Sequence, residues 1–314
     1  MKKILVTGSS GLVGSALKKI ACERGISDDF IFVSSRDADL TNYQDTERMF
    51  QKYQPTHVIH LAACVGGLFK NMKYKVDMLE KNLLINFNVV RCSHQLGVKK
   101  LISCLSTCIF PDQTAYPINE GILHNGPPHF SNDAYAYAKR MLEIQSKAYR
   151  EQYGDNFICV IPTNIYGPHD NFNLEDGHVI PALIHRCYLA KQAGESFRVL
   201  GTGKPLRQFI YSEDLAELFL EVLFNYKGSD SLILSVSESD EVSIREVATK
   251  IAKAYNYEEM IEFTENSSQD GQYKKTADNT KLMKFLPDLT FTPISEGIQR
   301  SVEWFTKNYS SARK

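Results

Sequence analysis

A tyrosine and a lysine stand four residues apart in the stretch YAYAK, as Tyr135 and Lys139. Residues at this spacing share one face of an α-helix, so the ammonium can act on the phenol and favour its phenolate form. A hydroxyl and a thiol stand two residues apart in LSTCIFP, as Ser106 and Cys108, just after a run of strand-forming residues. Together these groups predict acid–base chemistry, with an amphipathic helix surface and a buried strand end as the plain alternatives.

A glycine-rich segment, TGSSGLVGSAL, follows a short apolar run near the start of the chain. Its pattern G-x-x-G-x-x-G permits a tight turn and a close approach of the backbone, and the N-terminus of the following helix can hold a diphosphate. We therefore predict a dinucleotide-binding loop at this point. The residues of this loop are Gly8, Ser9, Ser10, Gly11, Leu12, Val13 and Gly14.

The end of the second predicted strand bears on the choice of dinucleotide. Arg36 stands there, 22 residues after Gly14, where an acidic residue would bind the 2′-hydroxyl of NAD. A guanidinium at this position suits the 2′-phosphate of NADP(H) instead. Asp37 follows directly and keeps NAD open as an alternative.

Five short strand-forming runs alternate with helical patterns, which is typical of a parallel sheet with helices on both faces. These runs are residues 3–7, 30–34, 57–61, 100–105 and 157–161. A helix is predicted between the third and fourth runs, and a second long helix over residues 132–153 carries YAYAK. The first of these helices is indicated by apolar residues at helical spacing, Leu79, Leu83, Phe87 and Val90. Both helices could supply a dimer face.

The second half of the chain changes character at Gly167. Loop residues (GPHDNFNLEDG) come first, followed by a helix opened by Pro181, by GTGKP and by short polar turns. We predict an α/β protein with a doubly wound parallel sheet of the Rossmann type and a smaller α/β substrate-binding lobe. The sheet domain would comprise residues 1–166, rejoined by about 208–235, and the lobe residues 167–207 and 236–314.

The composition argues against several classes of partner. The 36 basic and 37 acidic residues nearly cancel, so we expect neither nucleic acid nor an anionic membrane as a partner. Seven cysteines without C-x-x-C spacing predict reduced thiols in a cytoplasmic protein and no zinc or other metal site. No apolar stretch approaches the roughly 20 residues that cross a bilayer. The segment MKKILVTGSSG is expected to be a strand rather than a signal peptide.

These motifs, together with HLAA, Asn82 and PTNIYGP, resemble the extended short-chain dehydrogenase/reductases. Within that family, STCIFP, PTNIYGPHDNF, GHVIPAL and RQFIYSEDL resemble the branch that acts on GDP-4-keto-6-deoxy-D-mannose. Members of that branch invert C3 and C5 of this substrate and reduce its C4 ketone with NADPH. The resemblance covers essentially the whole chain, and it implies a homodimer that pairs the two long helices in a four-helix bundle.

The resemblance implies a role for each chemical group. Ser106 and Tyr135 would donate hydrogen bonds to the ketone oxygen of the substrate. Tyr135 would also give a proton to the reduced ketone, while Lys139 would hold the nicotinamide ribose. Cys108 and His178 would exchange the protons at C3 and C5, since a thiol and an imidazole both titrate close to neutrality.

The same resemblance implies two sets of binding residues. Cofactor contacts would extend from the glycine loop, Arg36 and Lys139 to Pro162, Thr163, Asn164, Ile165 and His178. Substrate contacts would come from Asn164, Arg186, Leu200, Arg207 and Asp270. The two arginines suit a diphosphate, because a planar guanidinium can bind two oxygens at once.

Other activities of related proteins can be weighed against particular residues. Sugar-nucleotide 4,6-dehydratases carry Thr-Asp-Glu after the serine, because elimination of water needs a carboxylic acid, and this chain has Thr107-Cys108-Ile109 there. Two alternatives stay open: another epimerase or reductase of sugar nucleotides, and a catalytically silent protein of the same fold that senses dinucleotides. A silent scaffold needs none of the predicted catalytic groups, so their joint presence favours an enzyme.

Overall fold

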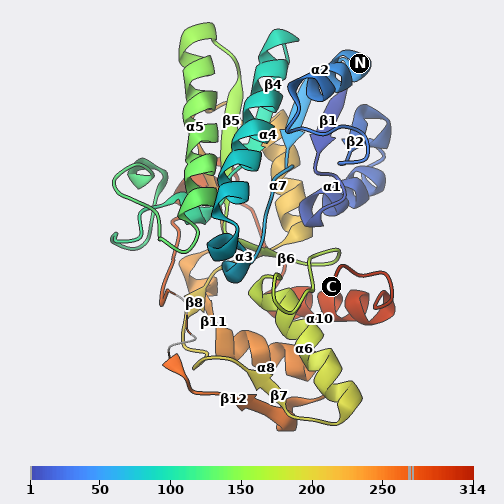
Figure 1. Cartoon of the computed structure of the whole chain (residues 1–314), viewed down its shortest axis with the longest axis vertical. Helices are drawn as coiled ribbons and strands as arrows, with labels where there is room; N and C mark the ends of the chain where they lie inside the picture. The colour runs from blue at the N-terminus through green and yellow to red at the C-terminus, as the bar shows by residue number, and fades with distance from the viewer. Residues whose placement is uncertain (1, 268–269, 271) are drawn as a thin grey trace.

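The computed structural model describes residues 2–267, 270 and 272–314, and only the backbone of residues 68 and 69. Its main sheet has six parallel strands in the order β10-β5-β4-β3-β1-β2 (Figure 1). The strands are β1 (Ile4–Thr7), β2 (Phe30–Val33), β3 (His57–His60), β4 (Lys100–Cys104), β5 (Phe157–Pro162) and β10 (Leu232–Leu234). The five predicted strands are thus confirmed, and β10 is an addition at the sheet edge.

Helices cover both faces of this sheet, which confirms the predicted doubly wound α/β class. One face packs against α1 (Leu12–Glu23) and α7 (Ser212–Phe224). The other face packs against α2 (Tyr43–Tyr53), α4 (Lys75–Gln95) and α5 (Asp133–Tyr153). Strands buried on both faces need apolar residues at every position rather than alternately, and β1 and β5 are buried along their whole length.

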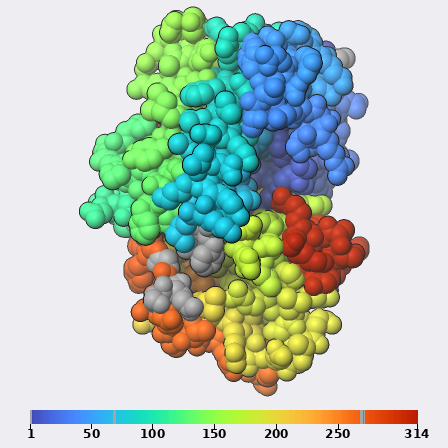
Figure 2. All heavy atoms as spheres, in the orientation of Figure 1, coloured from blue at the N-terminus to red at the C-terminus, as the bar shows by residue number. Residues whose placement is uncertain are grey.

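A second mass lies below the sheet (Figures 1 and 2). Its three small sheets pair β6 (Asn164–Tyr166) with β9 (Phe209–Tyr211), β7 (Phe197–Val199) with β12 (Ile261–Phe263), and β8 (Leu206–Arg207) with β11 (Val242–Ser243). The other α-helices are α3 (Leu68–Lys73), α6 (Val179–Ala193), α8 (Ile244–Ala254), α9 (Thr280–Phe285) and α10 (Ile294–Lys307). Single turns of 3₁₀-helix are η1 (Ser27–Asp29), η2 (Thr107–Ile109), η3 (Glu120–Ile122), η4 (Glu238–Asp240) and η5 (Glu258–Met260). Of these elements, η1, η2 and α9 pack with the sheet domain.

The helix α6 begins two residues earlier than the sequence predicts. His178 is its N-cap, the helix begins at Val179, and Pro181 lies inside the first turn. A proline is tolerated there because the first backbone N–H groups of a helix have no intrahelical partner. The correction matters for the site, because it places His178 directly at the helix N-terminus.

The segment 208–235 packs mainly against the sheet domain. Apolar residues of α7 share one buried cluster with β1 and α1, and β10 pairs with β5. A separate apolar cluster joins α6, α8 and α10 in the lower mass. These contacts support the predicted division into two lobes, whose boundaries stay a prediction.

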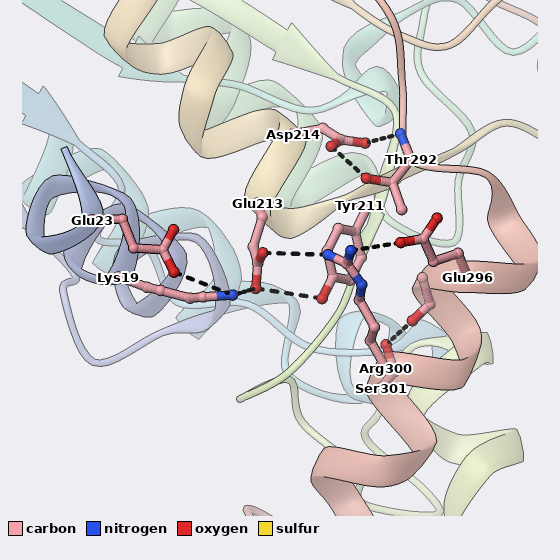
Figure 3. Close-up of polar contacts among 10 residues, drawn as sticks. Lys19, Glu23, Tyr211, Glu213, Asp214, Thr292, Glu296, Arg300 and Ser301 are labelled. Carbon is pink, nitrogen blue, oxygen red and sulfur yellow. Dashed lines mark hydrogen bonds and ion pairs between the residues drawn. The ribbon is translucent and has the colours of Figure 1, made fainter.

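An ion-pair network joins the two masses where α1, α7 and α10 meet (Figure 3). Glu213, in the first turn of α7, pairs with Lys19 at 2.6 Å and with Arg300 at 3.7 Å. Asp214 accepts the backbone N–H of Thr292 at 2.8 Å and its hydroxyl at 2.7 Å. Partly exposed ion pairs contribute only about 0.2–1 kcal/mol each, so the network adds little to the stability of this contact.

Candidate active site

The glycine loop lies at the carboxyl end of β1, beside the point where the strand order reverses between β1 and β3. Gly8 has φ of 70°, a conformation that side chains rarely adopt, and a Cβ there would lie 2.7 Å from the backbone nitrogen of Ala62. A Cβ on Gly14 would lie 2.7 Å from the carbonyl oxygen of Gly8. The loop is therefore drawn tightly under the N-terminus of α1, which leaves a cradle open to a diphosphate.

A cavity of about 600 Å³ adjoins this loop. Ser9, Ser10, Phe32 and Ser34 are among its lining residues, so the ends of β1 and β2 shape it together. The cavity also extends along α1 past Lys18 and Cys22. The fit to a dinucleotide therefore rests on the glycine loop, with phosphates at the start of α1.

The turn after β2 separates the roles of Arg36 and Asp37. The carboxylate of Asp37 accepts the backbone N–H of Ser34 at 2.8 Å and its hydroxyl at 2.9 Å. These hydrogen bonds lower the pKa of Asp37. Arg36 is exposed, and its guanidinium has no ion-pair partner in the part of the chain that the structure describes. The carboxylate of Asp37 is therefore hydrogen-bonded within its own turn, and the guanidinium of Arg36 is available to bind an anion.

Ser106 and Cys108 are joined by the 3₁₀ turn η2, which follows β4. Ser106 is the N-cap of this turn, and its Oγ accepts the backbone N–H of Cys108 at 3.4 Å. Cys108 is 7% exposed. Burial raises the pKa of the Cys108 thiol, while Lys275, the hydroxyl of Ser106 and Lys139 act in the opposite direction.

Two hydrogen bonds attach α5 to the end of β4 and to η2. Lys139 is buried, and its Nζ donates to the carbonyl oxygen of Cys104 at 2.7 Å. Arg140, also buried, donates from Nε to the carbonyl oxygen of Ile109 at 2.6 Å. The ammonium and the serine–cysteine turn therefore meet at the carboxyl end of the sheet.

The electrostatics of Tyr135 differ from the sequence-based expectation. The Nζ of Lys139 lies 5.8 Å from the centre of the Tyr135 ring, but it does not lower the pKa of the phenol. Burial raises the pKa of Tyr135 well above its ordinary value, and the nearby thiols of Cys108, Cys104 and Cys64 raise it further. Burial disfavours the phenolate form of Tyr135, and the ammonium of Lys139 is already hydrogen-bonded to the carbonyl oxygen of Cys104. The desolvation effect on the pKa is therefore the larger one.

His178 approaches the site from the lower mass. It is exposed and has no side-chain hydrogen bond to its helix. The carbonyl oxygen of Asp176, two residues before it, accepts the backbone N–H of Gly67 at 2.9 Å. Gly67 belongs to the segment after β3 that also carries Cys64, whose backbone N–H and C=O both bond to the side chain of Asn82. No described hydrogen bond links His178 to Cys108.

The predicted residues at 162–165 span the end of β5 and the start of β6. Pro162 ends β5, and Thr163 donates its backbone N–H to Leu234 in β10 at 3.1 Å. Asn164 is exposed, and its Nδ2 donates to the carbonyl oxygen of Gln208 at 2.9 Å. Ile165 packs against the sheet core. This crossing point joins the sheet to the lower mass and faces the same edge as the glycine loop.

The predicted substrate residues lie in the lower mass, in two places. Leu200 is exposed after β7, close to Thr202, which donates its N–H and its hydroxyl to the two oxygens of Asp270 at 2.8 and 2.7 Å. Arg207 donates to the backbone of Leu206 at 2.7 Å, and Arg186 has no ion-pair partner among the described residues. Burial lowers the pKa of both guanidiniums. Glu241 acts against this effect at Arg207, whereas no described acidic group does so at Arg186. A desolvated guanidinium is suited to an anionic ligand.

Lys275 is a site residue that sequence reasoning missed. Its charge acts on Cys108, Arg207 and Asp112, and burial lowers its pKa. The flanking backbone is held by a bond from Ile118 N–H to Thr276 O at 2.8 Å and by one from Ala277 N–H to Gln208 Oε1 at 2.7 Å. No local pattern distinguishes it from the adjacent Lys274, since only the long-range pairing brings it to the thiol.

Comparisons with known proteins agree with this arrangement. The family model described as the NAD dependent epimerase/dehydratase family matches residues 4–234. A curated GDP-L-fucose synthase of Dictyostelium discoideum is 55% identical over 100% of this chain and 98% of its own length. A probable GDP-L-fucose synthase of Drosophila melanogaster is 51% identical over 100% of both chains.

A solved structure shows the same likeness in three dimensions. It is a GDP-L-fucose synthetase from Naegleria fowleri bound to NADP, with a TM-score of 0.95 and 50% sequence identity. The alignment covers 100% of this chain and 95% of that one. The chain therefore belongs to the NAD dependent epimerase/dehydratase family and, within it, to the GDP-L-fucose synthases.

Proposed function

We propose that this protein converts GDP-4-keto-6-deoxy-D-mannose to GDP-L-fucose by inverting C3 and C5 and reducing the C4 ketone, with NADPH as the cofactor. The observation that carries the proposal is the meeting of Ser106, Cys108 and the Tyr135–Lys139 pair at one sheet edge, beside the glycine loop. Full-length identity of 55% to a curated GDP-L-fucose synthase supports the same activity.

The substrate ketone explains why these groups belong together. C3 and C5 both flank C4, so loss of either proton leaves an enolate whose oxygen needs hydrogen-bond donors. Ser106 and Tyr135 are the proposed donors. Cys108 removes the proton from each carbon, and His178 donates a proton to the opposite face of that carbon. Arg186 and Arg207 bind the GDP diphosphate. The other substrate contacts come from Asn164, Leu200 and Asp270.

The reduction places a second demand on Tyr135. Bound NADPH supplies the hydride for C4. Tyr135 then gives its phenolic proton to the C4 oxygen, which requires the phenol to be protonated beforehand, and its raised pKa meets that requirement at neutral pH. Lys139 fixes the nicotinamide ribose, and Pro162, Thr163, Ile165 and His178 complete the cofactor contacts.

Incubation with GDP-4-keto-6-deoxy-D-mannose and NADPH tests the proposal. We expect NADPH to be consumed and the product sugar to have the L-fuco configuration by NMR. A product of another configuration would indicate a different epimerase or reductase. Cofactor binding without turnover would indicate a dinucleotide-sensing scaffold.

The first mutational prediction concerns the cofactor. Arg36→Ala should shrink the preference for NADPH over NADH, because the free guanidinium is the proposed partner of the 2′-phosphate. The preference is measured as the ratio of kcat/KM for the two cofactors, with Arg48→Ala on the exposed face of α2 as a control of equal charge. An unchanged ratio in Arg36→Ala would remove this residue from the account.

We also infer a homodimer, from an apolar surface on α4 and α5. These helices lie side by side on one face of the sheet (Figure 1). Leu84 and Phe87 are exposed on α4, and Tyr137, Met141 and Ile144 are exposed on α5. The apolar residues that predicted α4 lie only partly on this surface, because Val90 is buried in the core. Pairing of this face with its copy would form the four-helix bundle.

Light scattering tests the dimer. We expect a mass twice the 35.6 kDa of one chain, and the double variant Leu84→Glu/Ile144→Glu should be monomeric because the charges would be desolvated in the interface. Leu189→Glu, at an exposed apolar position on α6, is the matched control and should stay dimeric. A monomeric mass for the unmodified protein at working concentration would reject the dimer.

We infer a cytoplasmic location from the thiols. All seven cysteines are free, which suits a reducing compartment. Among the described residues, no helix has the length and apolar character to span a membrane. Cell fractionation with an antibody against the native protein would test the location.

A further inference from the structure

One residue of the lower mass lines the cavity beside the glycine loop. His169 lies in the turn between β6 and α6, yet it shares this cavity with Ser9 and Ser10 of the glycine loop and with Lys18 of α1. It is not among the predicted cofactor contacts, and the proposed chemistry does not use it. Because the start of α1 is the site for the dinucleotide phosphates, a side chain across the same cavity can reach that ligand.

The backbone of His169 has a conformation that glycine adopts at lower cost. Its φ is 67°, in the left-handed region. Gln54 and Asn256 also have positive φ, but they stand at the ends of α2 and α8, where a left-handed residue commonly ends a helix. His169 follows a strand, so this explanation does not apply to it. Strain of this kind persists only where the surrounding structure fixes it, and it clusters at ligand-binding sites.

Contacts from the C-terminal part of the chain hold His169 in place. Its ring centre lies 4.5 Å from that of Trp304 in α10, and its carbonyl oxygen accepts a hydrogen bond from Nη2 of Arg313 at 2.7 Å. The backbone N–H of Phe172 donates to the carbonyl oxygen of Arg313 at 2.7 Å, and its ring stacks on Phe305. The C-terminal segment, red in Figure 1, lies with this loop below α1. His169 is therefore presented to the cavity by a packed framework.

The charges around the cavity suit an anion. Lys18 has no ion-pair partner among the described residues, whereas Lys19, which also lines the cavity, pairs with Glu213 at 2.6 Å. None of the described lining residues is acidic. A neutral imidazole carries one N–H in either tautomer, so His169 can donate to a phosphate oxygen without being protonated.

We propose that His169 is a cofactor-binding residue contributed by the lower mass, whose imidazole donates a hydrogen bond to the diphosphate of NADP(H) across the cavity from the glycine loop. The diphosphate is common to NADPH and NADH, so this contact adds affinity for both. It is thereby distinct from the contact proposed for Arg36, which discriminates between them through the 2′-phosphate.

The inference rests on the cofactor use in the proposed function, and it is tested by binding without substrate. His169→Phe keeps an aromatic ring beside Trp304 but removes the N–H. We expect the Kd for NADPH, measured by calorimetry, to rise by about 10-fold or more, the loss expected for a hydrogen bond to a charged group. The Kd for NADH should rise by the same factor. An unchanged Kd, or a rise for NADPH alone, would overturn the proposal.

Two further variants separate binding from folding. Glycine adopts a φ of 67° without strain, so His169→Gly should fold and should also lose affinity for both cofactors. A loss in His169→Phe that is absent from His169→Gly would show that ring bulk is responsible, which would overturn the proposal. His129→Phe is the matched control, because the His129 ring also lies 4.5 Å from an aromatic ring, that of Phe130, away from this cavity. Its Kd values should equal those of the wild type.

The outcome for His169 is separable from that of the proposed reaction. Trp304 is the single tryptophan of the chain, so its fluorescence spectrum checks that the framework under residue 169 is intact in His169→Phe. An unshifted spectrum together with weaker binding of both cofactors supports the assignment. Wild-type protein that binds NADPH but does not consume it with the substrate would refute the proposed function and leave this assignment standing.

Discussion

Cys108→Ser should reduce the exchange of the C3 and C5 hydrogens with deuterated solvent by ~10²-fold or more, the loss expected when an acid–base group is removed. Serine keeps the size of the side chain but does not titrate near neutrality. Hydride transfer should survive, because Ser106 and Tyr135 activate the ketone separately. The variant should then slowly reduce the unepimerised ketone to a GDP-6-deoxyhexose of the D series.

The pH dependence gives the same experiment a second readout. Burial raises the pKa of the Cys108 thiol, so the thiol is mostly protonated at neutral pH and only the thiolate can take a proton from carbon. Exchange by the wild type should therefore increase with pH above neutrality, and Cys108→Ser should lack this increase.

Two comparisons complete the Cys108 experiment. Cys64→Ser changes another thiol near Tyr135 and should leave solvent exchange close to the wild-type rate. His178→Asn should still permit proton removal but impair reprotonation on the opposite face. Unchanged exchange in Cys108→Ser would mean that Cys108 has only a structural role as a buried residue at the strand end. The base would then be another group.

Tyr135→Phe should nearly abolish reduction, with a loss of about 10²–10⁴-fold in the rate of NADPH oxidation. The phenol is the proposed proton donor to the C4 oxygen, and phenylalanine removes only that hydroxyl. Folding and cofactor affinity should be retained, because the Tyr135 hydroxyl has no hydrogen bond to another described residue. Thermal unfolding and the fluorescence of bound NADPH check both points.

Tyr137 provides a matched control on the same helix. Its side chain is exposed, so Tyr137→Phe also removes one hydroxyl from α5 but away from the buried site. We expect this variant to reduce the ketone at the wild-type rate. Wild-type turnover in Tyr135→Phe would mean that another group supplies the proton.

Periodicity and local motifs were enough to predict the sheet and the residues at its carboxyl edge. Gly8 and Ser106 follow β1 and β4, which are buried almost throughout because both faces of a parallel sheet are covered. The helix that carries Tyr135 and Lys139 begins and ends where the sequence predicts, with Gly154 in a left-handed conformation after its last residue. These apolar runs and helix-ending residues lie close together in the sequence, so they can be recognised without knowing the tertiary structure.

The electrostatic state of the site was decided only by the tertiary structure. The spacing of Tyr135 and Lys139 predicts a lowered phenol pKa, but folding buries the phenol and directs the ammonium to the carbonyl oxygen of Cys104. Lys275 acts on Cys108 from far along the chain, because long-range pairing brings their segments together. Desolvation and charge proximity depend on which distant segments pack together, and no local pattern encodes them.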